Sequence, residues 1–70
     1  LATAGTGDVL TGLMVGLVAQ GMKPEIASIA AVYIHGVAGR MAEKEHGSYG
    51  VCAEDVADNI GKAIKSIMEL

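Results

Sequence analysis

The sequence predicts an all-α chain of three helices that follow a glycine-rich turn. Apolar residues recur at helical spacing from Asp8 onward. Hydrophobic residues make up 51% of the chain but aromatic residues only 3%, a composition typical of helices packed through aliphatic side chains. No alternating apolar run has the length of an ordinary strand. With 70 residues, the chain can form at most one small domain.

The first helix is expected over residues 8–20. Gly21 follows it at the place of a left-handed C-terminal cap. Gly12 and Gly16, like Gly36 and Gly39 further on, are expected to allow close contact between helices. Apolar residues cover most of the circumference, which is typical of a buried helix; they are Val9, Leu10, Leu13, Met14, Val15, Leu17 and Val18.

The second and third helices are expected over residues 24–45 and 53–69, with a loop at residues 46–50 between them. Pro24 suits the first turn of the second helix, where Glu25 lies near the positive end of the dipole. The buried face of the second helix is predicted to hold Ile26, Ala30, Tyr33, Ile34, Val37 and Met41. The buried stripe of the third helix is predicted to hold Val56, Ile60, Ala63, Ile64 and Ile67.

Charge and cysteine content exclude several classes of protein. The net charge is −3 and no basic cluster exists, which argues against nucleic-acid binding. The longest apolar stretch, residues 9–19, falls short of the ~20 residues that span a bilayer. Cys52 is alone, so an internal disulfide is impossible and we interpret Cys52 as a structural thiol that binds no metal. These features predict a soluble, cytoplasmic protein with no membrane partner.

The apolar content exceeds what so short a chain can bury. The mean hydropathy is +0.44, whereas a domain of this size buries only about 60% of the surface its unfolded chain exposes. The chain also begins at Leu1, only a few residues before its first notable feature. We therefore expect a piece of a larger protein, with its excess apolar surface against a missing N-terminal part or a second copy in a homo-oligomer.

The glycine turn at residues 4–8 (Ala-Gly-Thr-Gly-Asp) is the candidate chemical centre. Glycines let the backbone approach a ligand closely, and the first amides of a helix lack intrahelical acceptors, so this turn could hold a phosphate. Asp8 could then take a proton from an attacking hydroxyl. The simpler interpretation is that Asp8 is an N-cap and the glycines form a turn. The absence of a following Lys rules out a Walker A loop.

The runs AGTGDVLTG, GLVAQG, AAVYIHGVAG and SYGVCAEDV resemble the C-terminal part of the NAD(P)H-hydrate dehydratases, a family of the ribokinase-like superfamily. The resemblance covers nearly all of residues 1–70. It implies a doubly wound α/β domain whose sheet comes from the missing N-terminal part. Cys52 and Glu54 stand where the family usually has Thr and Ser, a departure that affects helix capping more than chemistry.

The resemblance also implies an activity. A hydrated NADH or NADPH would be phosphorylated on its added hydroxyl by ADP or ATP, with Mg²⁺, and phosphate would then be eliminated. Gly7 would contact the nucleotide, Asp8 would bind the substrate as its general base, and Gly5 and Thr6 would complete the anion site. No residue of the chain is expected to ligate a metal. His35 marks the family, but its place on an apolar face is more typical of a hydrogen-bonded core residue.

Two alternatives remain open. The same turn would serve a ribokinase-like kinase acting on a sugar or pyrimidine alcohol. The 70 residues could also act as a helical association module with no activity. The chain alone is expected to be inactive, since it offers little that could bind a nucleotide base.

Overall fold

The computed structural model describes residues 5–47 and 51–68, which form three helices and no strand. They are α1 (Thr6–Ala19), α2 (Pro24–His46) and α3 (Ala53–Met68). The three predicted helices are confirmed, although α1 begins two residues earlier than expected. The prediction that His46 lies in a loop is wrong, because it is the last residue of α2. Ala4 of the expected turn and residues 48–50 of the expected loop lie outside the described residues.

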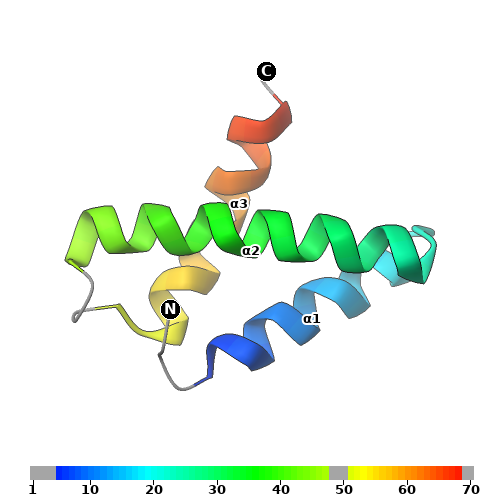
Figure 1. The fold of residues 1–70 in the computed structure, drawn as a ribbon, viewed down its shortest axis with the longest axis horizontal. Helices are drawn as coiled ribbons and strands as arrows, with labels where there is room; N and C mark the ends of the chain where they lie inside the picture. The colour runs from blue at the N-terminus through cyan, green and yellow to red at the C-terminus, as the bar shows by residue number, and fades with distance from the viewer. Residues whose placement is uncertain (1–4, 48–50, 69–70) are drawn as a thin grey trace.

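Helix α2 is the central element, and both other helices pack against it. In Figure 1, α1 runs beneath one half of α2 and α3 crosses behind its middle. Contact between α1 and α3 is smaller. The principal-axis extents are 35 × 28 × 15 Å. Because a helix with its side chains is about 10–12 Å across, so thin an arrangement leaves a large part of each helix uncovered.

Glycines define both ends of α1. Gly5 is its N-cap, in the left-handed region at φ 88°. At the other end, Gly21 has φ 100° and its N–H donates to the Val18 carbonyl at 2.9 Å. The Met22 N–H donates to the Leu17 carbonyl at 3.1 Å. These two bonds form a Schellman motif, so the predicted left-handed cap at Gly21 is confirmed.

The other helix ends use proline, glycine and a carboxylate. Pro24 opens α2, as predicted, and Gly47 (φ 76°) closes it with an N–H bond to the Glu43 carbonyl at 2.7 Å. Before α3, the Cys52 N–H donates to Asp55 Oδ2 at 2.9 Å. A carboxylate three residues into a helix that accepts from the preceding amide is one half of a capping box. Asp55 therefore supplies the cap that the Cys52 side chain cannot.

The core consists of small side chains at the crossing of α2 and α3. Its buried members are Ala38, Ala42, Val51, Val56 and Ala63, with Val9, Ile34, Val37, Met41 and Ile60 packed around them. The predicted stripe on α3 is confirmed at Val56 and Ala63, which are buried, and at its half-buried isoleucines. Alanines at the contact let the helix axes approach closely.

The predicted buried face of α2 is only partly right. Ile26 and Tyr33 are exposed, whereas the buried face runs through Ala27, Ala31, Ala38 and Ala42. The buried face is thus one residue further along the helix at its N-terminal half. Helical spacing assigned the face with Ile26 and Tyr33 to the interior. The two partner helices instead pack on the alanine stripe and leave the larger side chains on the open side.

The prediction that α1 is buried is wrong for this chain. Thr6 is its only buried residue among those described, and Val15 is 63% exposed. A Cβ built on Gly12 or Gly16 would meet nothing within 4 Å. These glycines therefore make no close helix contact here, contrary to expectation. Helix α1 is apolar on a side that nothing in the described structure covers.

One polar side chain lies inside the core. Asn59 on α3 is only 2% exposed, and its Nδ2 donates to the Asp55 carbonyl at 2.8 Å. Its Oδ1 is buried without a hydrogen-bond partner. An unpaired buried acceptor costs about 1–3 kcal/mol. The periodicity of α3 gave no indication of this residue, because Asn is usually exposed.

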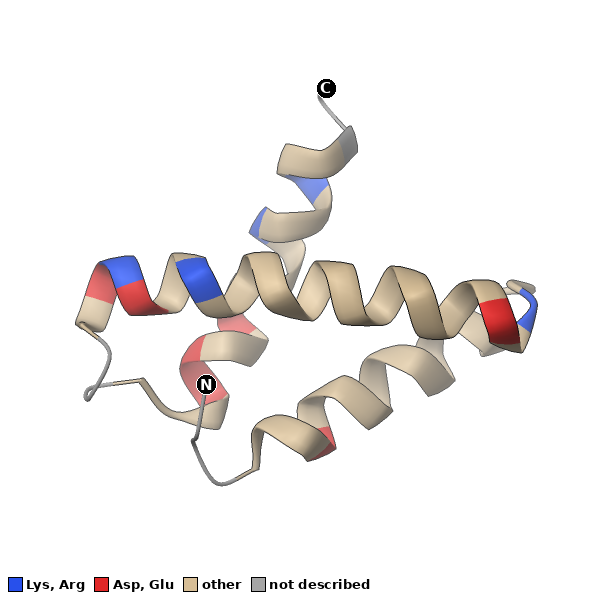
Figure 2. Cartoon of the chain, viewed as in Figure 1, with Lys and Arg blue, Asp and Glu red and all other residues tan. Residues whose placement is uncertain are grey.

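Charged residues are unevenly distributed along the helices. Figure 2 shows them at the two ends of α2 and on α3, whereas α1 carries a single acid and the middle of α2 has none. The uncharged surface thus coincides with the exposed apolar side chains of α1 and α2, which are Val15, Val18, Ile26, Ile29, Val32 and Tyr33. No helix among the described residues is long and apolar enough to cross a membrane.

Candidate anion-binding turn

Gly5 sets the geometry of the turn. Its φ of 88° belongs to the left-handed region, which costs side-chain-bearing residues about 1–2 kcal/mol. A Cβ on Gly5 would also lie 3.1 Å from the Ala53 Cβ. Two independent constraints therefore require glycine at this position. The same closeness places the first residue of α3 against the N-cap of α1.

The amide of Gly7 is the available donor in the turn. The N–H groups of Asp8 and Val9 donate to the Gly5 carbonyl at 3.1 and 3.2 Å, which closes the first turn of α1. The Gly7 N–H precedes these bonds, where a helix offers no intrahelical acceptor. Gly7 is exposed, and a Cβ built on it would meet nothing within 4 Å. A phosphate oxygen could therefore reach the backbone of this exposed residue.

Asp8 lies beside that amide with its side chain exposed. It is the third residue of α1, not its N-cap, so the simpler interpretation of Asp8 as a cap does not hold. Among the described residues, no Lys, Arg or His forms an ion pair with it. A carboxylate that is not engaged in a salt bridge remains able to accept a proton from a substrate hydroxyl.

Thr6 is placed differently from its neighbours. It is 8% exposed, so its side chain is largely inaccessible to a ligand. Its carbonyl oxygen lies 3.0 Å from Nε2 of His35 on α2. The hydroxyl of Thr11, one turn further along α1, donates to the Gly7 carbonyl at 3.0 Å. Side chains from two elements thus bind carbonyls in the first turn and hold it in place.

The sequence indicated that His35 forms a hydrogen bond, but it could not identify the partner. A histidine on an apolar face needs a polar partner when it is buried, and the expectation of a hydrogen-bonded His35 is confirmed. The partner lies 29 residues earlier in the chain, at a backbone atom. Periodicity cannot identify such a partner, because every residue has a backbone carbonyl and the sequence does not show which one lies near the ring.

The positive ends of two helix dipoles meet at the turn. Because Gly5 contacts Ala53, the N-terminal end of α3 lies beside that of α1. Each N-terminus carries about half a positive charge. Glu54 and Asp55 in the first turn of α3 offset part of it. The Asp55 carboxylate is engaged by Cys52 and lies near His46, and α1 contributes its own dipole.

A network of polar contacts lies where α2 ends and α3 begins. Asp55 Oδ2 accepts from both the N–H and the thiol of Cys52, at 2.9 and 3.2 Å. Asp55 Oδ1 lies 3.4 Å from Nε2 of His46. Three contacts hold the pKa of Asp55 below its usual range. The backbone bond from Cys52 has the largest effect, the thiol bond of Cys52 the next, and the attraction of His46 the smallest; desolvation opposes them. Cys52 is exposed and serves the helix cap, which is a structural role.

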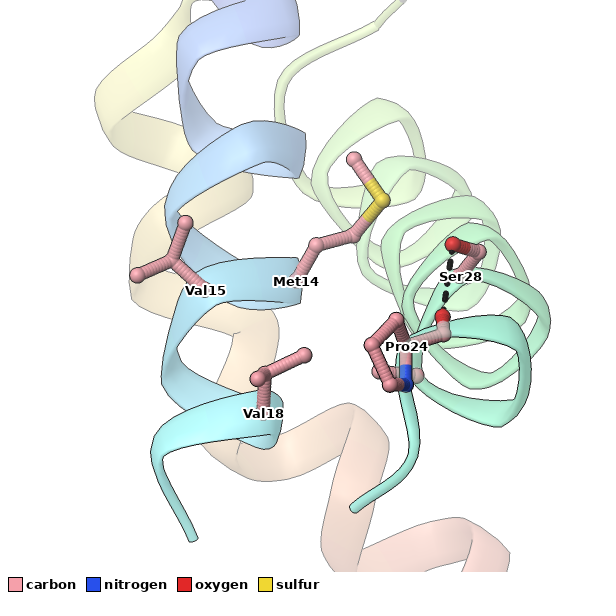
Figure 3. Close-up of a pocket in the computed structure, with 6 residues that line it drawn as sticks. Met14, Val15, Val18, Pro24 and Ser28 are labelled. Carbon is pink, nitrogen blue, oxygen red and sulfur yellow. Dashed lines mark hydrogen bonds between the residues drawn. The ribbon is translucent and has the colours of Figure 1, made fainter. Parts of the chain in front are cut away.

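Two hollows lie elsewhere on the chain. An apolar one of about 260 Å³ lies between the end of α1 and the start of α2, where Figure 3 shows Met14 and Val18 reaching toward Pro24 and Ser28. A polar one of about 420 Å³ is lined by His35, Gly36, Gly39, Arg40 and Glu43 of α2. Asp8 and Gly7 line neither hollow. Both residues are exposed in the described part of the chain.

The residues described do not supply a cation site. Within residues 5–47 and 51–68, no group of three or more His, Cys, Asp or Glu side chains is arranged to hold a metal ion. Asp8 is the only acid of α1. The Mg²⁺ that the resemblance implies is usually held by one or two carboxylates together with substrate phosphates, and Asp8 is the one carboxylate that α1 could contribute.

Comparison with known proteins identifies the family. The family model described as NAD(P)H-hydrate dehydratase matches residues 1–62. The chain is 41% identical over 69 residues to a bifunctional NAD(P)H-hydrate repair enzyme Nnr of Moorella thermoacetica, covering 99% of this chain and 13% of that protein. It is 34% identical over 65 residues to an ADP-dependent (S)-NAD(P)H-hydrate dehydratase of Bacillus subtilis, covering 93% of this chain and 24% of that protein. No solved structure matches the chain at a significant level.

The chain therefore belongs to the NAD(P)H-hydrate dehydratase family. This confirms the resemblance found in the sequence. The match includes the whole glycine turn, α1 and α2 and most of α3. The chain spans only about an eighth of the length of the repair enzyme and about a quarter of the dehydratase.

Proposed function

We propose that the chain is part of an enzyme that dehydrates hydrated NADH or NADPH with ADP or ATP as co-substrate. The proposal rests on family membership together with one observation: in the glycine turn, the exposed backbone of Gly7 at the start of α1 lies next to the exposed Asp8 carboxylate. The names of the relatives, which include ADP-dependent (S)-NAD(P)H-hydrate dehydratases, support the same substrates.

The turn supports a division of roles. The Gly7 amide and the positive end of α1 stabilise the oxygens of the phosphoryl group as it moves. Asp8 accepts the proton of the substrate's added hydroxyl, whose oxygen then bonds to phosphorus as the bond to the nucleotide breaks. Loss of the phosphate and a neighbouring proton from the substrate restores the reduced nicotinamide. Gly5 holds the turn, and Thr6 presents its backbone to the site.

The rest of the domain is proposed to be a doubly wound α/β unit that covers the exposed apolar sides of α1 and α2. The apolar hollow between Met14, Val18 and Pro24 could receive side chains from that unit. Burying this surface would add stabilisation of roughly 25 cal/mol per Å². It would also turn the exposed edge at Asp8 into one wall of a cleft, in a cytoplasmic protein that could assemble into a homo-oligomer.

Product analysis tests the reaction. The complete protein that carries this chain is incubated with hydrated NADPH or NADH and with ADP or ATP. Recovery of the absorbance of the reduced nicotinamide, with inorganic phosphate in equal amount, is the expected result. Failure to regenerate NAD(P)H with either nucleotide would refute the proposed function.

The competing kinase predicts a different product from the same turn. A ribokinase-like kinase would leave a stable phosphorylated alcohol and release no phosphate. Sugar and pyrimidine alcohols offered with ATP, followed by mass spectrometry of the products, distinguish the two. We expect no phosphorylated alcohol to accumulate, because the residues shared with the family extend well beyond the Gly-Thr-Gly-Asp tetrad that such kinases have in common.

A further inference from the structure

His35 makes a contact that ties α2 to the candidate anion-binding turn. Its Nε2 lies 3.0 Å from the Thr6 carbonyl oxygen. A carbonyl can only accept a hydrogen bond, so Nε2 must carry the proton in this contact. His35 is half-buried and Thr6 is buried, which shields the bond from competition by water.

The accepting carbonyl and the candidate donor belong to one rigid group. The Thr6 C=O and the Gly7 N–H are the two ends of the same peptide unit, which is planar and trans. Rotating this plane turns both ends together. A bond that fixes the direction of the Thr6 oxygen therefore also fixes the direction of the Gly7 N–H. Donation to the oxygen further polarises the peptide and strengthens its N–H as a donor.

At the Gly7 end, the His35 bond adds to the support that the first turn of α1 gives. Gly7 has no side chain, nothing surrounds the position of its Cβ, and its amide precedes the hydrogen bonds of the first turn. A glycine in such a place loses much conformational freedom when it is held in one orientation. An amide that must face a phosphate during reaction is most effective when it is already oriented.

We propose that His35 is a positioning residue that aims and polarises the Gly7 amide through the Thr6 carbonyl. The proposal rests on the function proposed above, in which this amide stabilises the phosphoryl group. His35 itself touches neither substrate nor nucleotide in this account. It acts only through the peptide unit between Thr6 and Gly7.

Two substitutions in the complete protein separate this role from packing. The amide nitrogen of Gln reaches the position of imidazole Nε2, whereas that of Asn reaches only Nδ1. We therefore expect His35→Gln to keep kcat near the wild-type value. His35→Asn should lower kcat by roughly tenfold or more, with less change in KM, though by less than the ~10²–10³-fold loss of an entire oxyanion donor.

Ser66→Ala is the matched control, because it removes a hydroxyl bond of 3.1 Å to a carbonyl on α3. Its kcat should be unchanged. Equal activity of the Gln and Asn variants, or equal loss in both while they remain folded, would overturn the proposal. Thermal unfolding establishes whether each variant is folded.

A measurement on the unmodified protein decides the matter even if the variants do not fold. ¹⁵N NMR of His35 at neutral pH should show Nε2 protonated, and the Gly7 amide proton should show the downfield shift of a polarised donor. A neutral ring with its proton on Nδ1 would overturn the proposal. This readout is independent of turnover, so absence of dehydratase activity would refute the proposed function without deciding the role of His35.

Discussion

Gly5 and Gly7 lie on either side of Thr6, yet the structure gives them different surroundings. Gly5 has a left-handed backbone and lies against Ala53, whereas Gly7 is helical in open space. We predict that Gly5→Ala destabilises the complete protein by about 1–2 kcal/mol, the cost of a left-handed side-chain-bearing residue. Gly7→Ala should leave stability nearly unchanged but lower kcat/KM, because a methyl group would obstruct the approach of the phosphate.

Urea unfolding and steady-state kinetics on both variants measure these effects. The two variants should differ: Gly5→Ala should lose stability, whereas Gly7→Ala should lose activity and keep normal stability. A Gly7→Ala enzyme with wild-type kinetics would contradict the placing of the anion at this amide.

Asp55 provides a pH-dependent contribution to stability. Its pKa lies below the usual 3.8, first because the Cys52 amide donates to it and last because of His46. A lowered folded-state pKa stabilises the fold above the unfolded value, and this contribution is lost as pH falls through the folded value. We predict that the difference in Tm between wild type and Asp55→Asn is complete at pH 7 and shrinks below pH 3.8.

Thermal melts of both proteins between pH 7 and pH 3 provide the test. Asp58→Asn, another loss of one acid on α3, controls for the change in net charge. A Tm difference between wild type and Asp55→Asn that persists undiminished at pH 3 would show that the Cys52 bonds do not depend on ionised Asp55.

Single residues were predictable where their role is local. Gly21 and Pro24 depend on their own backbone angles and on adjacent amides, so sequence position was sufficient for both. The His35 bond and the burial of Asn59 depend on how helices far apart in sequence cross. No local pattern carries that information, so the sequence predicted a hydrogen-bonded His35 without its partner, and it did not predict the burial of Asn59.

At the scale of elements, the number and placing of the helices followed from periodicity, but the choice of buried face on α2 did not. Both faces of α2 are apolar at its N-terminal half, since Ile26 and Ala27 are neighbours. Periodicity alone cannot choose between two apolar faces. Packing buries the alanine face at Ala27 and Ala31, and the larger side chains of Ile26 and Tyr33 remain exposed.

Gly16 tests whether α1 is covered in the complete protein. In the 70-residue chain a Cβ at Gly16 meets nothing, so Gly16→Ala should raise helix content, with a gain of at most about 1 kcal/mol. If the rest of the domain packs on this face, the same substitution should destabilise the complete protein.

Circular dichroism of the isolated chain and thermal melts of the complete protein supply the two measurements. Opposite signs are expected. Stabilisation in both settings would mean that the Gly16 face of α1 stays open, which would contradict the proposal that the missing part covers it.

At the scale of the whole molecule, the three helices leave an extended apolar surface. Ile29 is 74% exposed, and five other large apolar side chains are exposed with it. Soluble monomers rarely show a contiguous patch of this kind. We predict that the isolated 70-residue chain self-associates at micromolar concentrations, as the association-module alternative also requires.

Sedimentation velocity over a range of concentrations gives the result directly. Ile29→Lys should reduce association, whereas Lys62→Ala on α3, outside the apolar surface, should not. A monodisperse monomer at all concentrations would show that the exposed side chains need no partner, and would weaken both the association module and the missing-part proposal.

The α/β architecture proposed for the parent domain rests on resemblance alone. The described residues contain no strand, so neither periodicity nor packing could indicate a sheet. The residue types and their spacing were enough to predict the glycine turn. They could not predict that Gly7 and Asp8 are exposed. That exposure follows from helix packing, since the described residues leave most of α1 exposed or only partly buried.

The central claim is that the Gly7 amide and Asp8 form a phosphoryl-transfer site. Its most direct test is kcat/KM of Asp8→Asn for hydrated NADPH in the complete protein, with Glu25→Gln as a control acid in the first turn of α2. Loss of a general base predicts a decrease of about 10²–10⁴-fold at unchanged Tm, and none for Glu25→Gln. Turnover by Asp8→Asn within a few fold of wild type would contradict the account.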